Sequence, residues 1–165
     1  MNRNDQNITE LLQVELQLLE TSVVTLLHSL EKCNGIGSKP VYSFEEQESF
    51  DSLTSKFNRT SDLFTQKILR TAWTLLHEPF VPFIDLLNKS EKINLICSAD
   101  QIIAIRDLRN QIAHEYIPEA VQDLVPEVIG QTAHLVENVN CCKLFLSGRE
   151  WLSVNTDETD ITDGH

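Results

Sequence analysis

Helical periodicity runs through most of this sequence and constrains the fold more than any other feature. Apolar residues recur at helical spacing in four long segments, at about 8–33, 43–77, 99–115 and 120–146. No segment shows the sustained period-two alternation of a half-buried strand. Helix-stop and turn residues separate the segments, notably the Gly35–Pro40 stretch, Pro79, Pro82 and Pro118. We therefore predict an all-α fold, an antiparallel bundle of four to five helices.

The two N-terminal segments are expected to pack in different ways. Segment 8–33 carries a broad apolar stripe, which predicts a helix buried over much of its circumference. In segment 43–77, Ser43 and Glu46 have the spacing of a capping box, which predicts where that helix begins. On a 100° wheel its apolar side chains share one face, and four cations share the opposite face. These cations are Lys56, Arg59, Lys67 and Arg70. The basic face is either an ordinary solvated surface or a track that binds a polyanion such as RNA.

Chain length and composition indicate one domain. The 165 residues suffice for a single core, and we assign residues 1–148 to the bundle. Residues 149–165 are acidic with few apolar anchors, which predicts a disordered tail. No apolar run approaches the ~20 residues that span a bilayer, and the polar N-terminus lacks the apolar core of a signal peptide. We expect a cytoplasmic protein with no membrane association.

The cysteines and histidines show no ligand pattern. Cys33, Cys97, Cys141 and Cys142 include no C-x-x-C pair, and the adjacent Cys141 and Cys142 cannot bond each other without strain. We predict reduced thiols in the core. The five histidines are scattered without metal-ligand spacing, so we expect neither a metal nor a cofactor.

Residues 106–116 concentrate chemically useful side chains at one helix end. Arg106, Asn110 and His114 are successive i, i+4 neighbours, and Arg109 and Tyr116 lie on an adjacent strip. An arginine fork matches phosphate oxygens and stabilises charge that develops there, while an imidazole transfers protons near neutral pH. This combination suits phosphodiester cleavage without a metal. Alternatively, Arg109 and His114 only interact with the helix dipole at its C-terminal end.

The motif in this segment carries a family resemblance. Arg109, four further residues and His114-Glu115-Tyr116 form an R-x4-H-x-Y pattern. Together with the all-helical frame, it resembles HEPN-domain proteins of the HepT toxin type, in which an Arg-Asn pair such as Arg109-Asn110 is common. The compatible helical pattern covers about residues 8–146, but only the eight-residue motif is specific.

The resemblance implies a metal-independent ribonuclease toxin that forms a homodimer, with two copies of the motif meeting in an interface cleft. Arg109 would bind and polarise the scissile phosphate, His114 would act as acid or base, and Asn110 would assist. Tyr116 matches the tyrosine that a cognate minimal nucleotidyltransferase antitoxin of the MntA type modifies with AMP. The added bulk and negative charge would block the cleft.

The acidity of the chain opposes an RNA-binding role. The formal net charge is −12, whereas phosphate contacts provide most nonspecific affinity for nucleic acid. Many carboxylates lie in 45–51 and in the last sixteen residues, however, and screening over ~8 Å leaves room for local positive potential from Arg106, Arg109 and the basic face. One alternative is a non-catalytic HEPN module that docks a nucleotidyltransferase and helps present its substrate. Another is a structural bundle in which the motif shapes a dimer interface.

Overall fold

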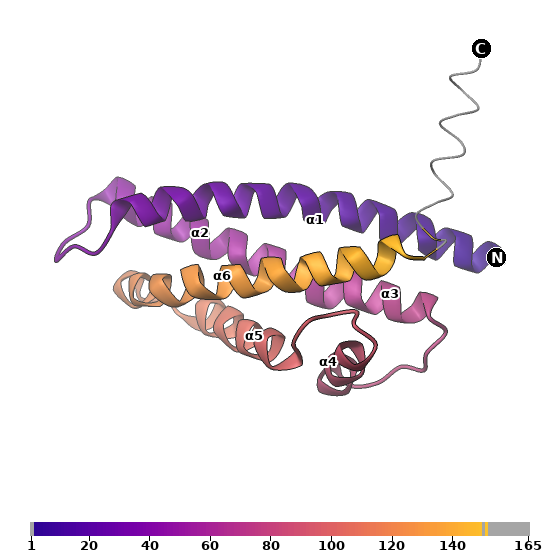
Figure 1. Ribbon diagram of the computed structural model, residues 1–165. Helices are drawn as coiled ribbons and strands as arrows, with labels where there is room; N and C mark the ends of the chain where they lie inside the picture. The colour runs from indigo at the N-terminus through magenta and orange to yellow at the C-terminus, as the bar shows by residue number, and fades with distance from the viewer. Residues whose placement is uncertain (1, 150, 152–165) are drawn as a thin grey trace, which may run out of the picture.

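The computed structural model describes residues 2–149 and 151, which form helices and contain no strand (Figure 1). The elements are α1 (Arg3–Ile36), α2 (Phe44–Asp62), the π-helix η1 (Leu63–Ile68), α3 (Leu69–Leu75), α4 (Phe83–Lys92), α5 (Ala99–His114) and α6 (Pro118–Ser147). The predicted all-α bundle is therefore confirmed.

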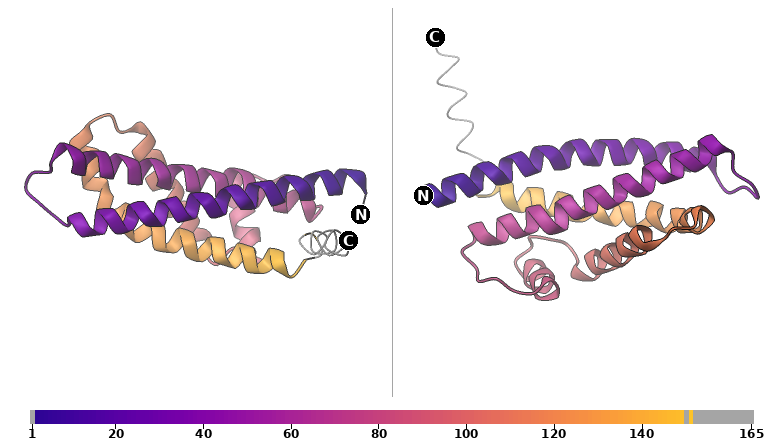
Figure 2. Two further views of the ribbon diagram at one scale, coloured as in Figure 1. Left: turned by 90° about the horizontal axis from the view of Figure 1, so that it is seen from above. Right: turned by 180° about the vertical axis from the view of Figure 1, so that it is seen from behind.

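Four long rods form the bundle, since α2, η1 and α3 follow one another as a single rod. This rod packs against α1 along its length, and α6 lies beside both (Figures 1 and 2). Helix α5 packs against α2 and α6, while the short α4 packs against α5. Successive long rods run in opposite directions (Figure 1). The arrangement brings the end of α2 next to α5, although the two are far apart in the sequence.

Local sequence signals determine where α2 begins and which face it buries. The Ser43 hydroxyl accepts from the amide N–H of Glu46 at 3.1 Å, and the Glu46 carboxylate accepts from the amide N–H of Ser43 at 2.9 Å. This is the predicted capping box, in which both groups satisfy otherwise unpaired helix donors. The apolar stripe Leu53, Phe57, Phe64 and Ile68 is fully buried. Burial of this stripe fixes the rod against α1 and α6.

The π-helix η1 interrupts a segment for which the sequence predicts one regular helix. Hydroxyl side chains crowd this region: Thr60 donates to the carbonyl of Lys56 and Thr65 to the carbonyl of Ser61, both at 2.8 Å. Such bonds compete with the backbone ladder and often bend or distort a helix. A π turn inserted into an α-helix is uncommon and is frequently found at functional sites.

Helix α1 is much more exposed than its sequence predicts. Leu11, Val14, Leu18 and Val24 keep 51%, 54%, 56% and 67% of their surface accessible. Helices α2, α3 and α6 cover only one side of α1. The expectation of a helix buried over much of its circumference is therefore wrong for this chain, because the broad apolar stripe extends beyond the side that the bundle covers.

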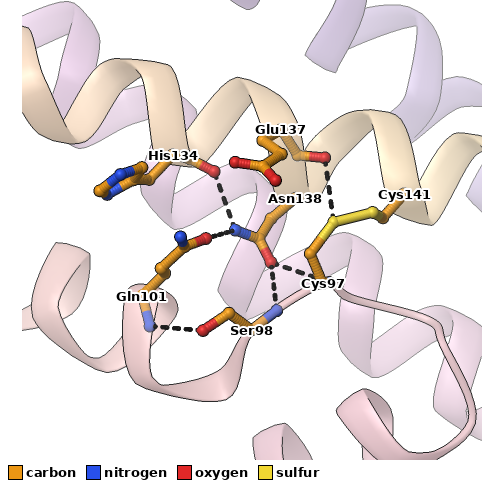
Figure 3. The surroundings of a disulfide bond; sticks show 7 residues. All are labelled: Cys97, Ser98, Gln101, His134, Glu137, Asn138 and Cys141. Carbon is orange, nitrogen blue, oxygen red and sulfur yellow. Dashed lines mark hydrogen bonds between the residues drawn. A yellow bond between two sulfur atoms is a disulfide. The ribbon is translucent and has the colours of Figure 1, made fainter.

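The expectation of reduced thiols is wrong for two of the four cysteines. Cys97 and Cys141 form a disulfide, with their Cα atoms 6.0 Å apart (Figure 3). Cys33 and Cys142 are buried free thiols, as predicted. The pair joins the segment before α5 to α6 across 44 positions, so no sequence spacing indicates it.

The buried amide of Asn138 fastens the same junction by hydrogen bonds (Figure 3). Its oxygen accepts from the backbone N–H groups of Cys97 and Ser98, each at 3.0 Å, and its nitrogen donates to Gln101 and to the carbonyl of His134. Asn138 is fully buried with its amide hydrogen-bonding capacity satisfied. The start of α5 is thus held to α6 both by the disulfide and by the hydrogen bonds of Asn138.

The C-terminal end is described only in part. Trp151 is half-buried against the core, and the Arg149 guanidinium lies over the rings of Phe145 and Trp151. The rest of the tail predicted for residues 149–165 lies outside the described residues. None of the described helices is long and apolar enough to cross a bilayer.

Candidate functional site

A cleft of about 520 Å³ lies where the end of α2 meets α5. We call it the Arg109 cleft. Its charged and amide side chains are Arg106, Arg109 and Asn110 on α5, and Asp62, Gln66 and Lys67 on α2 and η1. The cleft therefore contains three of the residues that the sequence singles out at the end of α5, and one cation of the predicted basic face.

Arg109 is held in the cleft by Asp62. Its Nε donates to Asp62 Oδ1 at 2.8 Å and its Nη2 donates to Asp62 Oδ2 at 2.7 Å. Such a bidentate pair fixes the plane and direction of the guanidinium, as a single bond would not. The hydrogen bonds that Arg109 donates to Asp62 raise the pKa of Arg109, against the opposing effect of partial burial. Arg109 is thus a permanent cation of defined orientation.

Arg106 is held by an aromatic ring. Its guanidinium carbon lies 4.1 Å from the centre of the Phe83 ring at the start of α4, a cation–π contact. The two arginines stand one turn apart on α5 and are oriented by residues of two other elements. The wall that α5 contributes to the cleft is therefore fixed in place.

The cleft is locally positive in an acidic protein. Lys67, Arg106 and Arg109 contribute three positive charges and Asp62 one negative charge, which leaves a net +2 on its lining. The acidic stretch 45–51 lies toward the opposite end of α2, roughly 17–25 Å away at 1.5 Å per residue. That separation exceeds the ~8 Å over which charges act at physiological salt. The lining of the cleft is thus suited to an anion.

His114 and Tyr116 lie outside the lining of the cleft. His114 is the last residue of α5, exposed and one turn beyond Asn110, while Tyr116 follows the helix end and is 87% exposed. Five helical residues advance roughly 140° beyond a full turn, so Arg109 and His114 face different directions. A single chain therefore groups Arg109 with Arg106 and Asn110 and does not bring His114 and Tyr116 to the same point.

The other cations of the predicted basic face have separate surroundings. Lys56 donates to the Ser29 hydroxyl of α1 at 2.7 Å. Arg70 donates to the carbonyl of Val81 at 2.8 Å and lies over the Phe80 ring. Arg59 is exposed. The wheel that placed these side chains on one arc assumes 100° per residue throughout, and the π-helix changes that angle between Arg59 and Arg70.

Two residues of the cleft could not be inferred from the sequence. Asp62 is 47 positions from Arg109, and no spacing rule connects them. Gln66 lies on a π turn that the sequence does not reveal. Among the described residues, no group of three or more histidine, cysteine or carboxylate side chains is placed to hold a metal ion.

Comparison of the chain with protein-family models, with characterised proteins and with solved structures finds no match. The HEPN resemblance therefore depends on the R-x4-H-x-Y motif together with the helical frame. Interpretation of the cleft depends on its own geometry and charge.

Proposed function

We propose that this chain is a metal-independent endoribonuclease toxin of the HEPN type, which cleaves RNA in the cytoplasm at a site completed by a second copy of the chain. The observation that carries the proposal is the oriented Arg109 guanidinium in a positively charged cleft. An arginine fork fixed in advance at a phosphate site stabilises transition-state charge without reorganising during the reaction.

The roles follow from the chemistry of the side chains. Arg109, assisted by Asn110, binds the scissile phosphate, and Arg106 and Lys67 attract the neighbouring backbone. His114 accepts the proton of the ribose 2′-hydroxyl as that oxygen attacks phosphorus, or donates a proton to the departing 5′-oxygen. The products are a 2′,3′-cyclic phosphate and a 5′-hydroxyl. Because Arg109 and His114 face different directions in one chain, we propose that a homodimer brings the arginine of one subunit to the histidine of its twin.

The accessibility of Tyr116 supports control by modification. Its side chain is 87% exposed, next to the exposed His114. A cognate minimal nucleotidyltransferase could reach the hydroxyl without unfolding the bundle. An attached AMP would place a phosphate beside the site and repel RNA.

The experiment is cleavage of end-labelled RNA by the purified protein in excess chelator. We expect cleavage by the wild type and its loss in Arg109→Ala and His114→Ala. Arg3→Ala and His28→Ala, at exposed positions on α1, are matched controls that should retain activity. Equal cleavage by all five proteins would reveal a contaminating nuclease and refute the assignment.

A non-catalytic docking module is the second candidate. It is favoured by the position of His114 outside the lining of the cleft. In that case the protein docks a nucleotidyltransferase and helps present its substrate, without cleaving RNA. Co-expression with a nucleotidyltransferase tests the toxin system separately, because it should add the mass of AMP to the wild type and not to Tyr116→Phe.

A further inference from the structure

The bond between Asp62 and Arg109 leaves part of the guanidinium unused. Arginine has five N–H donors, and Asp62 accepts from the edge formed by Nε and Nη2. The two N–H groups of Nη1 and the second N–H of Nη2 form the end edge of the fork. Within residues 2–149 and 151, no hydrogen bond to this edge is present. Arg109 lines the cleft with about 30% of its side chain exposed, so a bidentate acceptor can reach it.

The π-helix explains how Asp62 and a cation come to share one wall. Asp62 is the last residue of α2, and Lys67 follows five residues later in η1. In an α-helix the side chains of residues five apart point in directions that differ by roughly 140°. In a π-helix the hydrogen bonds run from i to i+5, so residues five apart lie near the same face. The π turn thus brings Asp62, which holds Arg109, and Lys67 to the same wall of the cleft.

We infer that Asp62 is a positioning residue, which holds the side edge of Arg109 so that the end edge is presented to a phosphate of RNA in the cleft. This inference rests on the proposed function and identifies how its central arginine is oriented. Without Asp62 the guanidinium would be free to rotate, and ordering it on binding would reduce affinity.

Positioning by Asp62 and simple electrostatics predict opposite effects on RNA affinity when Asp62 is neutralised. Asp62 carries a negative charge in a site for anions, so its neutralisation should tighten RNA binding if charge alone matters. Neutralisation should weaken binding if the orientation of Arg109 matters more. The direction of the change also distinguishes positioning from a blocking role. If Asp62 competed with phosphate for Arg109, its neutralisation would tighten binding.

The test measures binding of a fluorescent 2′-O-methyl oligoribonucleotide, which lacks the attacking hydroxyl, by anisotropy at several salt concentrations. We expect Asp62→Asn to weaken binding about tenfold, the loss of a charge-assisted bidentate contact. For this variant, the slope of log K against log salt should decrease by about the amount expected for one phosphate contact. Asp62→Glu should restore part of the affinity. Asp107→Asn removes an exposed carboxylate from the same end of α5 and should leave binding unchanged or slightly tighter.

A double-mutant cycle separates positioning from a general structural effect. In an Arg109→Ala background, Asp62→Asn should no longer weaken binding, because its effect passes through Arg109. Thermal unfolding checks that each variant is folded. If the wild type does not bind the probe, the proposed function fails and the inference fails with it. If the wild type binds and Asp62→Asn binds equally or more tightly, the inference alone is overturned.

Discussion

Glu15 is a carboxylate almost fully enclosed between α1 and α3. It is 7% exposed, and both of its oxygens lie 3.0 Å from the Thr71 hydroxyl, which can donate only one proton. Burial raises the pKa of Glu15 above its ordinary value of 4.5, while the bond from Thr71 and the charge of Lys67 partly oppose this. The folded protein therefore binds a proton here more readily than the unfolded chain does.

A prediction about pH follows from this raised pKa. Between 4.5 and the higher pKa of the folded state, folding takes up a proton, so the contribution of Glu15 to stability falls as pH rises through this window. Glu15→Gln removes that contribution and should flatten this part of the profile. The measurement is the free energy of unfolding in urea at intervals from pH 4.5 to neutrality. Glu10→Gln, at an exposed position on α1, is the control. Parallel profiles for wild type and Glu15→Gln would contradict the prediction.

The start of a helix depends on neighbouring residues, whereas the contacts of a helix face depend on residues far apart in the sequence. The start of α2 depends on Ser43 and Glu46, three residues apart, so local sequence predicts it. The Arg109–Asp62 pair instead joins residues 47 positions apart that only the bundle brings together. The sequence accordingly predicts the bundle and its basic helix end. It does not predict the residue that orients Arg109.

The junction between α5 and α6 yields a prediction about reduction. Removing the Cys97–Cys141 disulfide should lower the free energy of unfolding by roughly 4 kcal/mol, because the bond closes a loop of 44 positions in the unfolded chain. Asn138 still holds the start of α5, so the fold should survive. Once reduced, the Cys97 thiol lies within reach of the Glu137 carbonyl, 3.5 Å away, as a hydrogen-bond donor.

Urea unfolding with and without reductant measures this effect. Reductant should destabilise the wild type as much as Cys97→Ser combined with Cys141→Ser, and should not affect that double variant further. Cys142→Ser is not a suitable control, because Cys142 is 1% exposed in the core and its substitution perturbs packing. A wild type that is indifferent to reductant would show that the two thiols are not bonded in solution.

The net negative charge of the chain opposes formation of the proposed dimer. Two chains of net charge −12 repel each other at low ionic strength, and the repulsion weakens as salt screens it. The proposed RNA binding in the cleft should have the opposite dependence, because salt weakens phosphate contacts. A site that needs both assembly and RNA should therefore work best at intermediate salt.

The proposed dimer makes a prediction that no single-chain mechanism shares. In a twofold dimer with one arginine and one histidine from different subunits in each site, a heterodimer of Arg109→Ala and His114→Ala has one site with both side chains intact and one with neither. Random exchange makes about half of the dimers heterodimers, so the mixture should regain about a quarter of wild-type cleavage although each variant alone is inactive. If Arg109 and His114 act within one chain, no subunit of the mixture holds both, and cleavage should stay at background.

Mixing after partial unfolding and refolding ensures exchange of subunits, and a tagged subunit pulled down with its untagged partner confirms this exchange. Confirmed exchange without recovered cleavage would reject the composite site.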